Sequence, residues 1–147
     1  IDTTGTGNGI TQARVPGNVE PNVIARDTDG DNLWDGFTGT GYLDMGSDIG
    51  DAASFVVNAP EAGTYTLTFR YANGGNVNGV NGDRPMAVTV NGTSAGNASF
   101  PGTGANNWDV WAETSIDVTL QAGANTIVIA NTIANGPNID RVVVTNN

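Results

Sequence analysis

The chain has 147 residues and a formal net charge of -10, with 15 acidic residues, five arginines, and no lysine, histidine or cysteine. A surface of this charge repels the phosphates of nucleic acid and anionic membrane lipids, so neither is expected as a partner. The missing residue types exclude disulfides, thiolate metal sites, cysteine nucleophiles, histidine-based triads, histidine zinc sites and Schiff-base chemistry.

The first distinctive segment is RDTDGDNLWDGF at residues 26–37, which carries the aspartates Asp27, Asp29, Asp31 and Asp35. Alternate aspartates in a glycine turn can converge on a hard cation that takes six to eight oxygen ligands. The segment departs from an EF-hand loop, because Asn32 and Thr38 stand where a glycine and a bidentate glutamate are required. A solvated acidic turn is the alternative. Mutual repulsion of the unneutralised carboxylates favours calcium over that alternative.

The remaining sequence alternates between apolar and polar residues, as β-strands do, with Tyr65, Leu67, Phe69 and Tyr71 on one face of the first long strand. Predicted strands cover residues 54–59, 64–72, 86–90, 116–120, 125–130 and 138–145. Glycine and asparagine at 61–64, 90–97 and 121–125 are typical of tight turns. Residues 73–83 form a long polar loop, either a flexible surface or a binding rim. The whole chain, residues 1–147, is therefore predicted to be one all-β domain, a sandwich or a barrel, with two antiparallel sheets favoured.

The order of five segments resembles one known group of proteins. These segments are AGTYTLTFRYANG, RPMAVTVNGT, SFPGTGANNWDVW, VTLQAGANTIVI and GPNIDRVVV. From about Gly39 to the C-terminus, the chain is similar to carbohydrate-binding modules of the family 6 and family 35 group. The resemblance implies a jelly-roll β-sandwich that binds a polysaccharide or oligosaccharide and performs no catalysis. It also implies a tethered polysaccharide-degrading domain, secretion from a bacterial cell and a monomeric module.

In this resemblance the sugar stacks on a loop tryptophan and is clamped by an asparagine, which correspond here to Trp108 and Asn138. Trp108 lies among small and polar residues in GANNWDV, and this favours a solvent-facing ring over core packing. Trp34 is the candidate for an opposite aromatic wall, and Phe37 and Tyr42 compete for that role. Arg84 could clamp a uronic-acid carboxylate, or it could pair with a surface acid such as Asp83.

The resemblance also implies a structural calcium whose ligands would include Gln12 and Asp140. Arg14 stands where a second acidic ligand is often found, and a guanidinium cannot bind a cation. One hypothesis is that aspartates of the 26–37 segment replace that ligand, so that one ion is shared by Gln12, Asp140 and one or two of Asp27, Asp29 and Asp31.

Two other functions remain open at this point. A calcium-dependent adhesion or structural β-domain would use the acidic loop to bind a protein partner. A small polysaccharide hydrolase would need a defined carboxylate pair, and no such pair is distinguished in this sequence. A lyase that uses Tyr and Arg stays open, although the chain is small for a polysaccharide enzyme.

Overall fold

The computed structural model describes residues 2–4, 7–10, 36–38, 42–46, 48–75 and 81–147. Across these residues the regular structure consists of strands, and no described helix is long and apolar enough to cross a membrane. The strands are β1 (Asp2–Thr4), β2 (Gly7–Ile10), β3 (Leu43–Asp44), β4 (Ala52–Ala59), β5 (Gly63–Ala72), β6 (Met86–Val90), β7 (Thr93–Ala98), β8 (Ala112–Leu120), β9 (Gly123–Asn131) and β10 (Asn138–Asn146).

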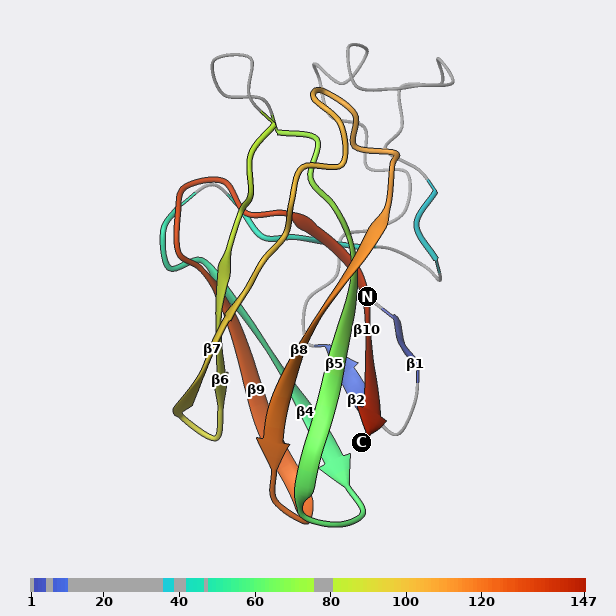
Figure 1. The fold of residues 1–147 in the computed structure, drawn as a ribbon, viewed down its shortest axis with the longest axis vertical. Coiled ribbons are helices and arrows are strands. Elements are labelled where there is room, and N and C mark those ends of the chain that lie inside the picture. The colour runs from blue at the N-terminus through green and yellow to red at the C-terminus, as the bar shows by residue number, and fades with distance from the viewer. Residues whose placement is uncertain (1, 5–6, 11–35, 39–41, 47, 76–80) are drawn as a thin grey trace.

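The strands form two sheets that face each other (Figure 1). One sheet contains β3–β10–β5–β8 and the other contains β4–β9–β6–β7. Apart from the β6–β7 hairpin, successive strands from β3 therefore alternate between the sheets in the order of a jelly roll. β2 extends the second sheet next to β4, and β1 joins the first sheet next to β10. The sequence prediction of a jelly-roll β-sandwich is confirmed. Its sheets are antiparallel except for β1, which runs parallel to β10.

The core lies between the sheets and follows the predicted alternation. Tyr65, Leu67, Phe69 and Tyr71 of β5 are all buried, while the threonines between them face outward. Fully burying a side chain such as Leu67 contributes about 1.5–3 kcal/mol. Phe100 completes the core, with its ring centroid 5.6 Å from that of Phe69 and 5.1 Å from that of Tyr71.

The segment 90–97 differs from its prediction as a turn. Only Asn91 and Gly92 form the turn, with φ of 51° and 82°, as a two-residue type I′ hairpin requires. The chain then continues as β7, whose small polar side chains lack the apolar alternation that marked the other strands. Gly96 has a φ of 104°, and the pairing of β6 with β7 shifts register between Val88 and Thr89, which indicates a β-bulge.

A buried asparagine connects the β6–β7 and β8–β9 turns, which lie at the lower end of the sandwich (Figure 1). Asn125 is fully buried, and its side-chain oxygen accepts hydrogen bonds from the side chain of Asn91 and the backbone N–H of Gln121, both at 2.9 Å. Its amide nitrogen donates to the carbonyls of Gln121 and Gly123 at 2.8 and 2.9 Å. The β6–β7 and β8–β9 turns are therefore held together by one saturated amide.

Candidate functional site

The loops at the other end of the sandwich are joined by backbone hydrogen bonds (Figure 1). The N–H of Thr103 donates to the carbonyl of Asn73 at 2.9 Å, and that of Asn106 donates to Gly74 at 2.8 Å. The loop after β5 is thereby fixed to the loop between β7 and β8. This end of the sandwich carries the described residues that the sequence singled out for ligand binding.

Phe100 links the same loops to the core. Its carbonyl accepts from the side chain of Asn73 at 2.8 Å, and its N–H donates to the carboxylate of Asp83 at 2.6 Å. The Tyr71 hydroxyl donates to the carbonyl of Pro101 at 3.0 Å. Burial and, secondly, the charge of Asp83 raise the pKa of Tyr71 above its usual value of 10, so the phenol stays neutral at physiological pH.

Trp108 is buried in a second, smaller apolar cluster with Tyr42 and Ala72, against which Phe37 and Trp111 pack. Only 6% of Trp108 is exposed, so the prediction of a solvent-facing ring is wrong. The small and polar neighbours in its loop did not indicate exposure, because the ring packs on the end of another strand. Gly74 permits this packing, since a Cβ added there would lie 2.8 Å from Cδ1 of the indole.

Tyr42 is also buried within this cluster, in agreement with the packing alternative. Its ring centroid lies 5.4 Å from that of Phe37 and 5.8 Å from that of Trp111. Trp34, the expected opposite wall, lies outside the described residues. The aromatic arrangement of this end is therefore a packed cluster rather than an open sandwich of two exposed rings.

Arg84 lies over the Trp108 ring, with its guanidinium carbon 5.3 Å from the ring centroid, which is within the range of a cation–π interaction. Its Nη1 donates to the carbonyl of Gly136 at 2.8 Å. A Cβ on Gly75 would overlap the guanidinium in its present position, so the absence of a side chain there leaves room for it. The Asp83 carboxylate accepts from Phe100 and from the Ser99 hydroxyl.

Asn138 is the first residue of β10 and is only 1% exposed. It pairs with Ala72 of β5 on one side and with Asp44 of β3 on the other. Because Ala72 packs in the Trp108 cluster, the asparagine lies next to that cluster. Its side-chain nitrogen is buried and has no hydrogen-bond partner among the described residues.

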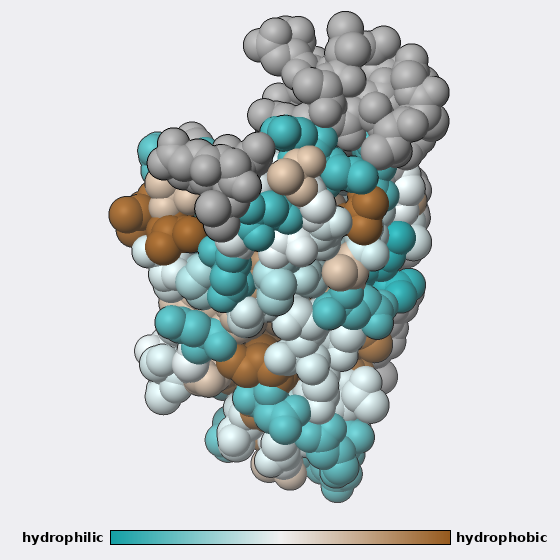
Figure 2. Space-filling model, turned by 45° about the horizontal axis from the view of Figure 1, so that its top comes forward, coloured by the Kyte–Doolittle hydropathy of each residue, from teal (hydrophilic) through white to brown (hydrophobic). Residues whose placement is uncertain are grey.

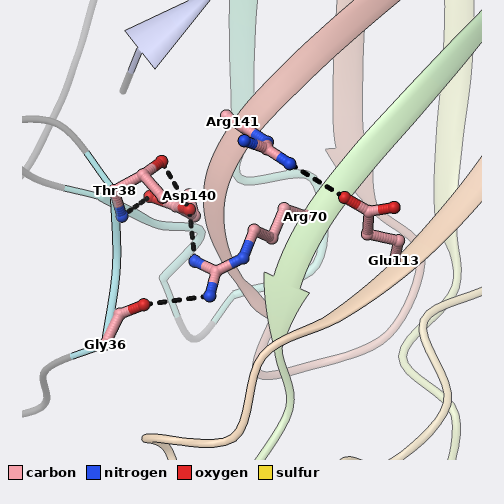
Figure 3. A network of polar contacts seen from close by, with 6 residues as sticks. All are labelled: Gly36, Thr38, Arg70, Glu113, Asp140 and Arg141. Carbon is pink, nitrogen blue, oxygen red and sulfur yellow. Dashed lines mark hydrogen bonds and ion pairs between the residues drawn. The ribbon is translucent and has the colours of Figure 1, made fainter.

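Asp140 is fully buried and lies in a polar network at the edge of β10 (Figure 3). One of its oxygens accepts from the N–H of Thr38 at 2.8 Å, and the other accepts from the Thr38 hydroxyl at 2.9 Å and Nη1 of Arg70 at 2.5 Å. Nη2 of Arg70 donates to the carbonyl of Gly36 at 3.0 Å. The Arg70 guanidinium carbon also lies 5.2 Å from the ring centroid of Trp111.

This network bears on the predicted calcium site. Within the described residues, no three acidic side chains come together as a metal site, and the charge of Asp140 is balanced by Arg70. The other expected ligands lie outside the described residues: Gln12, Asp27, Asp29, Asp31 and Asp35.

Comparison with known proteins places the chain in a family. The family description "Carbohydrate binding module (family 35)" matches residues 20–144. The chain belongs to carbohydrate-binding module family 35. It is similar to a solved family 35 module from Clostridium thermocellum, with 37% identity, a TM-score of 0.67, and coverage of 76% of this chain and 82% of the other. It is also similar to Xyl-CBM35 in complex with a disaccharide that contains glucuronic acid, with 34% identity, a TM-score of 0.69, and coverage of 96% and 93%.

The module also resembles parts of larger enzymes. It is 39% identical over 109 residues to an exo-beta-D-glucosaminidase from Amycolatopsis orientalis, covering 73% of this chain and 10% of the enzyme. It is 41% identical over 117 residues to the endo-1,4-beta-xylanase B of Cellvibrio japonicus, covering 78% of this chain and 18% of the enzyme. The chain thus spans less than a fifth of these curated relatives. It is a non-catalytic carbohydrate-binding module of the kind attached to glycoside hydrolases.

Several contacts that shape this site were not foreseen from the sequence. Gly74 and Gly75 allow Trp108 and Arg84 to approach the chain closely, and Asn73 links two loops. The signal for them was the composition of the 73–83 loop, where asparagine and glycine are concentrated next to a long strand. That composition indicates a binding rim but does not identify the partner of each residue.

Proposed function

We propose that the module holds a short stretch or a chain end of a cell-wall or algal glycan at the loop end that contains Asn138, Arg84 and Trp108. The observation that carries this proposal is the side-chain nitrogen of Asn138, which is buried next to the aromatic cluster and has no hydrogen-bond partner among the described residues. An unsatisfied buried donor costs about 1–3 kcal/mol, and a ligand oxygen would satisfy it. An amide is suited to sugar hydroxyls because it supplies a donor and an acceptor in one fixed plane.

The neighbouring side chains support a sugar as the ligand. The C–H face of a pyranose packs on aromatic rings, and the Trp108 indole at this end is the ring that a sugar would have to uncover. Arg84 covers one face of the indole, so stacking on that face requires the guanidinium to move aside. A guanidinium at this position favours a uronic-acid unit, because it can bind a carboxylate in two-point geometry. The glucuronic-acid ligand of Xyl-CBM35 is consistent with this assignment.

In the parent protein, the module would keep a polysaccharide-degrading domain on its substrate outside the cell. Once the module has bound the glycan, the tethered catalytic domain meets the same glycan in an intramolecular step. This raises the effective concentration of the catalytic domain at its substrate. We expect the module itself to be monomeric. The alternative is an adhesion domain that binds a protein instead of a glycan. Capture of a protein partner, together with no binding on a glycan array, would indicate that alternative.

Replacing Asn138 with alanine is expected to reduce glycan affinity at least about tenfold, which is about 1.4 kcal/mol. The same change should lower stability little, because the nitrogen that is removed makes no hydrogen bond among the described residues. Isothermal titration against a panel of uronic and neutral oligosaccharides, with thermal melts in parallel, measures both effects.

The matched control is Asn125→Ala, which removes an equally buried amide with a full set of hydrogen bonds at the opposite end. It should lower the melting temperature and leave the affinity at the loop end unchanged. Full affinity in the Asn138 variant would contradict the proposed clamp. Absence of binding to every glycan of the panel would contradict the proposed ligand class.

We further propose that calcium stabilises the module through the aspartates of the 26–37 segment, with Gln12 and Asp140 as the other ligands. The supporting observations are the sequence spacing of the carboxylates and the position of Asp140 in β10. If the ion binds only the folded state, chelation with EDTA should lower the melting temperature by several degrees, and added calcium should restore it. An unchanged melting temperature, with no metal detected by elemental analysis, would contradict this proposal.

A further inference from the structure

A groove of about 450 Å³ lies along the open edge of the sandwich, where β7 of one sheet faces β8 of the other. We propose that this groove is a second carbohydrate site, which takes a neutral oligosaccharide segment. Its volume falls within the range of about 300–1,000 Å³ that is typical of small-ligand sites. The groove is lined by Val90, Asn91, Thr93, Ser94, Ala95, Asp117, Val118, Thr119 and Gln121.

The walls of the groove are fixed before any ligand arrives. Asn91 and Gln121 belong to the two turns that the buried Asn125 holds together, and the Asn91 oxygen also accepts from the N–H of Thr126 at 2.8 Å. On the β8 side, the carboxylate of Asp117 accepts from the Thr66 hydroxyl at 2.6 Å. A site whose walls are already ordered loses little conformational entropy on binding, and this favours weak, hydroxyl-rich ligands.

The chemistry of the lining selects the ligand class. Val90 and Val118 are buried and provide an apolar floor, while hydroxyl and amide side chains surround it. These groups can exchange hydrogen bonds with sugar hydroxyls, and the floor can contact the C–H faces of the ring. Among the described residues of the lining, Asp117 is the one charged side chain and none is basic. A uronate would therefore be repelled here, in contrast to the loop end, where Arg84 is located.

The groove is separate from the proposed loop-end site. It adjoins the β6–β7 and β8–β9 turns at the lower end of the sandwich, whereas the loops around Asn138 are at the upper end (Figure 1). Outside the grey atoms, the face seen in Figure 2 shows hydrophobic side chains in separate patches. Two sites at opposite ends would let one module contact two chain segments, which increases residence on an insoluble glycan.

Nitrogen-15 NMR titration of the whole module tests this inference site by site. Neutral xylo-, manno- and malto-hexaose and an oligogalacturonate should each be added up to roughly 10 mM, because a site of this kind has an expected Kd in the millimolar range. At least one neutral hexaose should shift the amide signals of Asn91, Ser94 and Thr119, and the oligogalacturonate should leave them in place.

The blocking variant is Thr93→Trp, at an exposed lining residue that pairs with the buried Val90. Its indole should fill the groove and abolish those shifts. Its control is Ser115→Trp, which is likewise exposed but lies outside the lining and should retain them. Absence of groove shifts with all three neutral hexaoses would overturn the proposal, as would equal shifts with the oligogalacturonate. The signals of Asn138 and of the Trp108 indole report the loop-end site separately, so failure of one site is distinguishable from failure of the other.

Discussion

Replacing Arg70 with methionine is expected to lower the free energy of unfolding by about 3–5 kcal/mol, the cost of breaking a buried ion pair by removing one partner. The Asp140 carboxylate is fully buried, and Arg70 supplies the charge that offsets it, with a side chain that is 21% exposed. Without the guanidinium, the hydrogen bonds to Asp140 from the described residues would be reduced to the two from Thr38. Urea unfolding followed by tryptophan fluorescence measures the loss.

A double-mutant cycle with Asp140→Asn separates the ion pair from packing effects. The double variant should lose less stability than the sum of the two single variants, because neither partner is then left as an uncompensated charge. A loss below about 1 kcal/mol for Arg70→Met would place the pair with ordinary surface ion pairs and contradict the expectation. Repeating the melts in calcium shows whether a cation can replace the lost guanidinium next to Asp140.

Replacing Phe100 with alanine is expected to destabilise the module by about 3–5 kcal/mol, the usual cost of truncating a buried aromatic ring. The ring is fully buried and makes edge-to-face contacts with Phe69 and Tyr71. The backbone of the same residue bonds to Asn73 and Asp83 in the loops of the candidate site. The substitution should therefore also weaken glycan binding at temperatures where the protein is still folded.

Phe100→Leu is the graded control, since it keeps most of the apolar volume and should lose roughly half as much stability or less. Val56→Ala is the surface control, because that side chain is partly exposed on β4 and should change stability by no more than about 0.5 kcal/mol. If Phe100→Ala unfolded at the same urea concentration as the surface control, the proposed link between core and loops would be wrong.

Most of the fold could be predicted from the sequence because several strands alternate between apolar and polar residues and others are short apolar runs between turns. The buried faces of β5 and β6 are those that the alternation indicates. β7 was missed because its side chains are small and polar, and its strand conformation is imposed by pairing with β6. Local composition there indicates turns, and tertiary pairing overrides it.

The candidate site was only partly predictable, for a different reason. The family resemblance can indicate that Trp108, Arg84 and Asn138 lie at the same end of the molecule. Whether the Trp108 ring is exposed depends on which residues pack against it. Here Gly74 and Ala72 come from a distant strand end, and their contacts with Trp108 are not visible from the local sequence. The pairing of Asp140 with Arg70 joins residues 70 positions apart, and no spacing rule indicates it.

The bulge at Gly96 affects whether neighbouring modules can associate through the free edge of β7. β7 is an outermost strand, and a straight outer strand offers its free N–H and C=O groups to any other chain, which is how sheets aggregate edge to edge. The positive φ of Gly96 and the register shift between β6 and β7 interrupt that row of groups. An incoming strand therefore cannot form a continuous ladder of hydrogen bonds along β7. Modules packed densely along one polysaccharide fibre are thereby disfavoured from joining into a shared sheet.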